Sequence, residues 1–171
     1  VFTFRKLSKV GLNLHKIGIF CNFFLYADDI KLAKIIDNLQ DCEKLQKVLD
    51  AIIRWCQIHK LDININKCCI VSYNRKTNVI EYNYNIGGVE IKRCTEYRDL
   101  GIIMDSRLSF VPHINNINCK ALKMLGFVIR TTKDFKNTDC MFLLYFAYVR
   151  SILEYCTLVW DPYYKIRLLP H

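Results

Sequence analysis

The sequence predicts a mixed α+β fold in which short strands come first and helices follow. Its length of 171 residues and its 52% of apolar residues suit one compact domain with a sizeable core. Apolar residues come in short, often alternating runs up to about residue 107, and from Pro112 they recur at intervals of three and four. We therefore expect a strand-rich part over residues 1–107 and a helical part over residues 108–171, with the boundary near Leu108.

The first predicted element is a pair of strands around an acidic turn. Phe20 to Tyr26 are rich in Phe, contain Leu25, and run directly into Ala27-Asp28-Asp29, after which the apolar run resumes at Ile30. Runs of this kind on both sides of a short polar turn are typical of adjacent strands. The sequence thus predicts that the carboxylates of Asp28 and Asp29 lie at a tight turn.

A long helix is expected next. Asp37 and Gln40 have the spacing of a capping box, which marks a helix start. Apolar residues then recur with helical periodicity at Leu39, Cys42, Leu45, Leu49, Ile52, Ile53 and Cys56. This stripe predicts an amphipathic helix of about five turns.

Several short strands are predicted after this helix. Residues 61–65 alternate between apolar and polar and indicate a strand before Lys67, and residues 70–73 indicate another. Two further strands, residues 79–86 and 89–93, are expected on either side of Gly87-Gly88, which indicates a hairpin. Residues 97–104 are expected to form one further strand.

Two helices are expected in the last third of the chain. The stripe of the first consists of Ile114, Ile117, Ala121, Leu125 and Val128. The second, Cys140 to Trp160, is long and apolar enough to suggest a membrane span, but Arg150 and Glu154 lie near its middle, where each would cost about 2.5 to 3.5 kcal/mol in a bilayer. We expect a buried helix with an i,i+4 ion pair and no membrane partner.

Charge and cysteine content narrow the class of protein. Lys and Arg outnumber Asp and Glu by 25 to 16, a net charge of +9, which favours an anionic partner such as nucleic acid or a membrane surface. The nine cysteines include no C-x-x-C pair and no spacing with histidine that suits zinc, so we expect reduced, buried thiols in the nucleus or cytoplasm. The chain opens without Met and without a signal peptide, and we expect a fragment.

The adjacent carboxylates are the sharpest chemical feature. A rigid turn with two carboxylates suits Mg²⁺, which prefers oxygen ligands, and paired ions can drive in-line attack of a 3′-hydroxyl on a nucleoside triphosphate. The alternative is an ordinary polar turn, because Asp-Asp pairs are common in loops.

Residues around the pair carry a resemblance to a known family. Phe23 to Asp29, with its Tyr26-Ala27-Asp28-Asp29, is similar to the catalytic turn of reverse transcriptases of non-LTR (LINE-type, jockey-like) retrotransposons. The resemblance extends to Tyr163 in the same order through Leu39-Gln40, Trp55-Cys56, Leu61-Asp62-Ile63-Asn64, Lys67-Cys68, Asp99-Leu100-Gly101-Ile102, Phe110, His113-Ile114, Lys120-Ala121, Leu125-Gly126-Phe127, Arg130, Val149-Arg150-Ser151, Leu153-Glu154-Tyr155 and Val159-Trp160-Asp161-Pro162. It implies the C-terminal part of a polymerase palm followed by an all-helical thumb.

The resemblance also implies roles for single residues. Asp28 would be the principal ligand of two Mg²⁺ ions and Asp29 its neighbour, with Tyr26 and Ala27 beneath the primer end. Lys67 matches a lysine that is a candidate proton donor to pyrophosphate; the alternative is a solvated lysine at a strand edge.

Further matches concern the primer and template. Leu100 and Gly101 match the primer grip, and the alternative is a strand that needs no side chain there. The basic residues Lys120, Lys123, Arg130, Lys133 and Lys136 suit phosphate contacts along a template–primer duplex, although a solvated helix face explains any one of them equally well.

The implied function is RNA-directed DNA polymerisation from dNTPs, with an RNA template and a DNA primer as partners. Only 27 residues precede Asp28, and they do not match the upstream palm strand with the third metal-binding Asp, the fingers or an endonuclease. We therefore expect no polymerase activity from this chain alone. The alternatives are a decayed transposon-derived domain that binds nucleic acid without catalysis and a membrane-associated helical protein.

Overall fold

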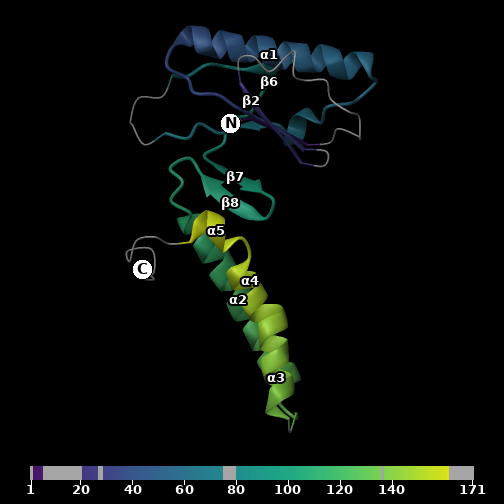
Figure 1. Cartoon of the computed structure of the whole chain (residues 1–171), viewed down its shortest axis with the longest axis vertical. Helices are drawn as coiled ribbons and strands as arrows, with labels where there is room; N and C mark the ends of the chain where they lie inside the picture. The colour runs from purple at the N-terminus through teal and green to yellow at the C-terminus, as the bar shows by residue number, and fades with distance from the viewer. Residues whose placement is uncertain (1, 6–20, 27–28, 75–79, 136, 162–171) are drawn as a thin grey trace. The chain divides into compact units, whose positions relative to one another are not determined.

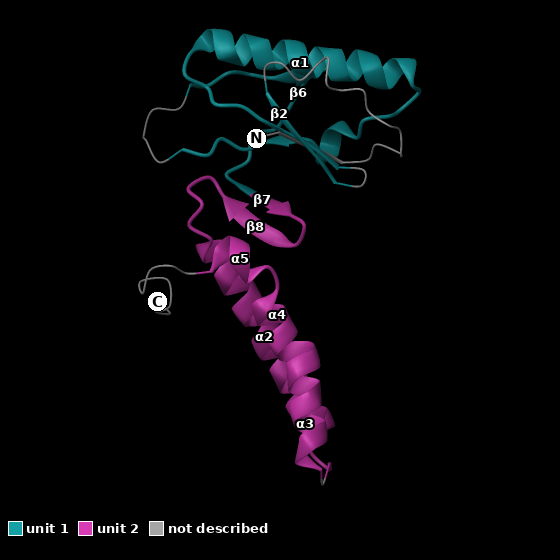
Figure 2. Cartoon of the chain, viewed as in Figure 1, with its two compact units in different colours: residues 1–96 teal, residues 97–171 magenta. Residues whose placement is uncertain are grey.

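The computed structural model describes residues 2–5, 21–26, 29–74, 80–135 and 137–161. The chain divides into two compact units, Val1–Glu96 and Tyr97–His171 (Figure 2). The α+β character that the sequence predicts is confirmed, since the first unit combines a sheet with one long helix and the second combines a hairpin with a helical pair. The boundary between the units precedes the predicted one near Leu108, because the last hairpin packs with the helices.

A four-stranded antiparallel sheet forms the base of the first unit (Figure 1). Its strands, in spatial order, are β2 (Asn22–Tyr26), β3 (Asp29–Ala33), β1 (Phe2–Arg5) and β4 (Cys69–Ile70). β2 and β3 are the two strands that the sequence predicts around the acidic turn.

The long helix α1 (Leu39–Ile58) is confirmed, but its cap lies one residue later than predicted. The side chain of Asn38, not Asp37, accepts the N–H of Asp41 at 3.0 Å. The Asp41 carboxylate in turn accepts the N–H of Asp37 at 3.4 Å. The arrangement is a variant of a capping box with Asn38 and Asp41 in place of Asp37 and Gln40, because the second bond comes from Asp37, the residue before the cap, and not from the cap residue.

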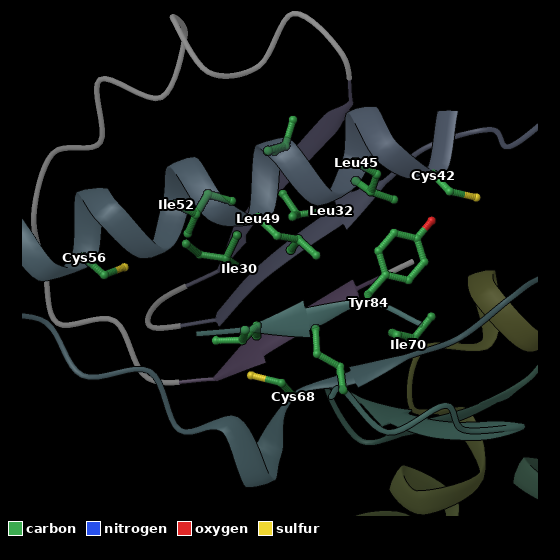
Figure 3. Close-up of a cluster of buried hydrophobic side chains, with 13 residues drawn as sticks. Ile30, Leu32, Cys42, Leu45, Leu49, Ile52, Cys56, Cys68, Ile70 and Tyr84 are labelled. Atoms are coloured by element: carbon green, nitrogen blue, oxygen red, sulfur yellow. The ribbon is translucent and has the colours of Figure 1, made fainter. Parts of the chain in front are cut away.

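The core of the first unit lies between α1 and the sheet. The helix buries Cys42, Leu45, Val48, Leu49, Ile52 and Cys56. These side chains meet Ile30 and Leu32 of β3, and Ile70 and Tyr84 close the cluster (Figure 3). Burial of Cys68 beside this cluster raises the pKa of its thiol to about 11, so it stays a neutral, unreactive thiol near pH 7.

The segment after α1 differs from the prediction. Residues 61–65 form no strand, and residues Ile65–Lys67 form a 3₁₀ turn, η3. Leu61, Ile63 and Ile65 pack against the core from an irregular segment, which explains why they alternate with polar residues. The hairpin around Gly87-Gly88 is confirmed as the short strands β5 (Asn85–Ile86) and β6 (Val89–Glu90), with both glycines at positive φ.

Residues 97–104 form not one strand but a hairpin. β7 (Glu96–Asp99) pairs with β8 (Ile102–Asp105), and the chain reverses at Leu100-Gly101. Periodicity alone does not separate one strand from two short ones here, because each strand of the hairpin has only four residues and shows too few alternations. Ile102 lies buried with Phe110, which places this hairpin in the core of the second unit.

Asp105 determines how the chain passes from β8 into the next helix. Its carboxylate accepts the N–H groups of Phe110 at 2.9 Å and Arg107 at 3.2 Å. Burial opposes the charged form, but the hydrogen bonds from Phe110, Ser109 and Arg107 outweigh it and lower the pKa of Asp105. These bonds hold the strained residues Leu108 and Phe110 at positive φ. The helix α2 (Val111–Thr131), which the sequence predicts, begins directly after them.

The helical stretch that packs against α2 departs from the expected single buried helix. It consists of α3 (Thr138–Leu144), a π-helical stretch η4 (Tyr145–Arg150) and α4 (Ser151–Glu154), and after a break it ends with α5 (Thr157–Trp160). Only 6% of its most apolar window is buried. The ion pair of Arg150 with Glu154 is confirmed and lies exposed. By length and composition this stretch could cross a membrane, which for one helix is weak evidence.

Burial of one helix face provides the first testable prediction. Ile52 is 1% exposed and Ile58, on the same helix, is 77% exposed. We expect Ile52→Ala to lower the free energy of unfolding of the first unit by about 3 kcal/mol, because it removes buried methyl groups and leaves a cavity. Ile58→Ala is the matched control and should change it by less than about 0.5 kcal/mol. Urea unfolding followed by Trp55 fluorescence measures both, and equal losses would contradict this packing.

Candidate functional site

The acidic hairpin places Asp29 at one end of the sheet. Asp29 begins β3 and pairs with Tyr26, the last residue of β2. Ile30 and Leu32 point into the core beneath α1, so by strand alternation Asp29 lies on the opposite face of the sheet. Tyr26 shares that face as the residue directly opposite and is 60% exposed. Ala27 and Asp28, the other predicted members of this turn, lie outside the described residues.

Lys67 lies at the same end of the sheet as Asp29. It ends η3, two residues before β4, and β4 pairs with β1 through Thr3 and Cys69. In this register, the chain that leads from Cys69 back to Lys67 runs toward the Arg5 end of β1. Arg5 in turn pairs with Asp29 of β3, on the other side of β1. In the sheet itself, two strand spacings, or about 10 Å, separate β4 from β3. Lys67 is exposed, and tertiary structure places it at the same end of the sheet as a carboxylate that is 38 residues away in sequence.

The sheet strands near Asp29 offer few other carboxylates that could bind a metal ion. The adjacent strands β1 and β4 have the sequences FTFR and CI and carry no carboxylate. Among the residues that the structure describes, no group of three or more His, Cys, Asp or Glu is placed to hold a metal ion. A carboxylate is nevertheless the ligand type that Mg²⁺ prefers, so Asp29 fits such an ion in chemistry as one member of a larger set.

In the second unit, Leu100 and Gly101 occupy a turn and not the predicted strand. Both have positive φ, 45° and 92°, as a tight hairpin turn requires. For a leucine this conformation costs about 1 to 2 kcal/mol. The hydroxyl of Tyr155 donates a hydrogen bond to the carbonyl oxygen of Leu100 at 2.8 Å. A Cβ atom on Gly101 would lie 3.2 Å from Cε1 of Tyr155, so the ring packs directly on the glycine.

Sequence reasoning missed the contact between Tyr155 and this turn. The two partners are 55 residues apart in sequence. The sequence singles out Tyr155 only as part of Leu153-Glu154-Tyr155, one of the segments that resemble the reverse transcriptase family. No local pattern marks such a pair, because the ordered turn and the broken helix end meet only through the fold.

The predicted basic residues of the helical part lie on one helix. Lys120, Lys123 and Arg130 are exposed on α2, and their spacings of three and seven residues place them on one side of it together with Phe127. The sequence of α2 contains no Asp or Glu, so its exposed surface is purely basic in charge. Lys133 is exposed just beyond α2, and Lys136 lies outside the described residues.

A buried histidine joins the hairpin to the helices. His113 is 1% exposed, its Nδ1 accepts the N–H of Ile103 at 3.3 Å, and its ring meets that of Trp160 edge to face. Its Nε2 has no hydrogen-bond partner within the described part of the chain. Burial, followed by the charges of Lys120 and Arg98, lowers the pKa of His113. The neutral ring is therefore the form that the fold requires.

This histidine predicts a pH dependence. Because its folded pKa lies below the unfolded value of about 6.5, the unfolded chain binds the proton more readily, and stability falls as pH drops below about 6.5. We expect urea unfolding of the second unit, followed by Trp160 fluorescence in a Trp55→Phe chain, to show this loss. His113→Asn should remove the dependence between pH 7 and pH 5, whereas His59→Gln, at an exposed position, should retain it. A dependence that survives His113→Asn would contradict the assignment.

The turn at Gly101 predicts a further difference between two glycines. Gly101→Ala adds strain at positive φ and a close contact with Tyr155, so we expect it to destabilise the second unit by about 2 kcal/mol. Gly88 has a similar φ of 85° and nothing within 4 Å of an added Cβ atom. Gly88→Ala should therefore destabilise the first unit only through the backbone strain of alanine at positive φ, by about 1 kcal/mol. Unfolding followed by Trp160 and Trp55 respectively measures both costs, and a smaller loss at Gly101 than at Gly88 would contradict the contact.

Comparison with known proteins adds an independent observation. No family model matches the chain, and no solved structure matches it significantly. The chain is similar to two curated proteins, each named RNA-directed DNA polymerase from mobile element jockey. The protein of Drosophila melanogaster is 34% identical over 93 residues, and that of Drosophila funebris is 35% identical over 95 residues.

These matches cover only part of each protein. In both cases they include 54% of this chain and 10% of the relative, so the chain spans about one tenth of the length of the relatives it matches. Over that stretch, the similarity supports a relationship to the reverse transcriptases of non-LTR retrotransposons.

Proposed function

We propose that this chain is the C-terminal palm and thumb part of a non-LTR retrotransposon reverse transcriptase. The observation that carries the proposal is the antiparallel hairpin of β2 and β3, which has Tyr26 and Asp29 opposite each other at one end of the sheet. The similarity to two RNA-directed DNA polymerases supports the same conclusion. Residues 1–107 would contribute to the palm and residues 108–171 to the thumb.

The proposed reaction is nucleotidyl transfer from a dNTP to the 3′-hydroxyl of a DNA primer on an RNA template. Asp28 and Asp29 would hold Mg²⁺, which lowers the pKa of the attacking hydroxyl and neutralises charge on the leaving pyrophosphate. Tyr26 and Ala27 would support the primer end. Lys67, at the same end of the sheet as Asp29, would donate a proton to the pyrophosphate.

Contacts to the duplex would come from the second unit. The Leu100-Gly101 turn exposes backbone that can approach the primer strand. The exposed basic side of α2, with Lys120, Lys123 and Arg130, suits the phosphates of a template–primer duplex.

We further propose that the 171 residues do not polymerise on their own. The other strands of the sheet, β2, β1 and β4, carry no carboxylate, and the resemblance implies a third aspartate as well as fingers. The alternative is a basic domain that binds nucleic acid without catalysis, which the carboxylate-free surface of α2 favours.

Primer extension tests the proposal. We expect no extension of a DNA primer on an RNA template by this chain alone with Mg²⁺ and dNTPs. A chimera should extend the primer when all 171 residues of this chain replace the corresponding part of the Drosophila melanogaster jockey polymerase. Asp28→Ala in the chimera should lower the rate by at least about 10³-fold, because the metal ligands act only together.

Ile35→Ala in the same chimera is the control, since Ile35 is 82% exposed and lies outside the proposed site. It should leave the rate unchanged. A folded but inactive chimera would favour the non-catalytic alternative, and extension by the chain alone would refute the proposed dependence on further parts of the polymerase.

A further inference from the structure

Tyr155 stands at the point where the helical stretch of the second unit breaks. It follows α4, and the next residue, Cys156, adopts a positive φ of 53°. The carbonyl oxygen of Tyr155 accepts the indole N–H of Trp160 at 2.7 Å. Trp160 is buried with Ile102 and Phe110. The backbone of Tyr155 is thus tied to the core of the unit, although its side chain is half exposed.

The side chain of Tyr155 reaches the tip of the β7–β8 hairpin with two different groups. Its hydroxyl donates a hydrogen bond to the carbonyl oxygen of Leu100. Its ring lies so close to Gly101 that a Cβ atom added there would be only 3.2 Å from Cε1 of Tyr155. The hydrogen bond fixes the direction of the Leu100 carbonyl, and the ring limits the movement of the glycine. Together they determine one conformation of the tip.

The tip needs such support because it is strained and exposed. Leu100 has φ of 45°, a conformation that leucine rarely adopts, and its side chain is 41% exposed. The cost of this conformation is comparable to the net contribution of one hydrogen bond. Without the Tyr155 hydroxyl, the tip would therefore populate other conformations to a substantial degree.

We propose that Tyr155 is a positioning residue for primer binding: it holds the Leu100-Gly101 tip in the conformation that contacts the primer strand. This inference rests on the function proposed above. When only a fraction of a protein has the binding-competent conformation, the apparent affinity falls by that fraction. Tyr155 would thus act on affinity for the duplex through the shape of the tip, without a contact of its own to the primer.

Binding of an RNA–DNA hybrid by the 171-residue chain tests the inference. The probe is a fluorescein-labelled hybrid duplex with a recessed DNA 3′ end, and anisotropy gives the Kd. We expect Tyr155→Phe to raise the Kd about fivefold, the factor that one net hydrogen bond supplies. Tyr148→Phe removes the same hydroxyl from an equally exposed tyrosine of the same helical stretch and should leave the Kd unchanged.

Amide hydrogen exchange, measured without nucleic acid, reports whether the Leu100-Gly101 tip keeps its conformation. In Tyr155→Phe, the hydrogen-bonded amides of β7 and β8 beside the tip should exchange about fivefold faster, whereas those of α2 should be unaffected, because the change is confined to the hairpin. Faster exchange together with weaker binding supports the proposal.

These measurements distinguish a failure of the proposed function from a failure of the inference about Tyr155. If the unmodified chain does not bind the hybrid, the proposed function falls and the inference falls with it. If the chain binds and Tyr155→Phe binds equally well, only the inference is overturned. Weaker binding with unchanged exchange beside the tip, or an equal loss in Tyr148→Phe, also overturns it, because the hydroxyl then acts directly or nonspecifically.

Discussion

Burial of Ile30 and Leu32 beneath α1 is the contact on which the candidate active site depends. Both side chains are almost fully buried, so the register of β3 cannot shift by one residue without turning them away from the core. The same register places Asp29 on the opposite face and pairs it with Tyr26 across the hairpin. The position of the carboxylate is thus a consequence of hydrophobic packing, because the strand alternates between its two faces.

The second unit is held together by polar contacts at the ends of its elements as much as by apolar packing. The Asp105 carboxylate fixes the turn into α2, the His113 ring meets the N–H of Ile103, and the Trp160 indole meets the Tyr155 carbonyl. Each contact joins a helix or its flank to a loop or strand. The hairpin that carries Leu100-Gly101 is therefore positioned both by His113, which follows it closely in sequence, and by Tyr155, which is 55 residues from Leu100.

The helical stretch after α2 shows why composition is an incomplete guide to burial. Its apolar residues suggest a core helix, yet Phe142, Leu143 and Leu158 are largely exposed. Only one side of the stretch faces α2, and the π-helical turn and the break at Cys156 rotate successive residues out of a single stripe. The exposed ion pair of Arg150 with Glu154 follows from the same arrangement, since it lies on the side away from α2.

The sequence by itself determined the α+β class, the strands around the acidic turn, the long helix α1, the Gly87-Gly88 hairpin and the apolar stripe of α2. These features have local signals: alternation, a three-to-four repeat, and residues that favour turns and caps. Tertiary structure alone decided that residues 61–65 form no strand, that residues 97–104 fold back at Gly101, and that Lys67 shares a sheet end with Asp29. It alone joined Tyr155 to Leu100. Such contacts depend on which distant segments become neighbours, and local periodicity carries no information about that.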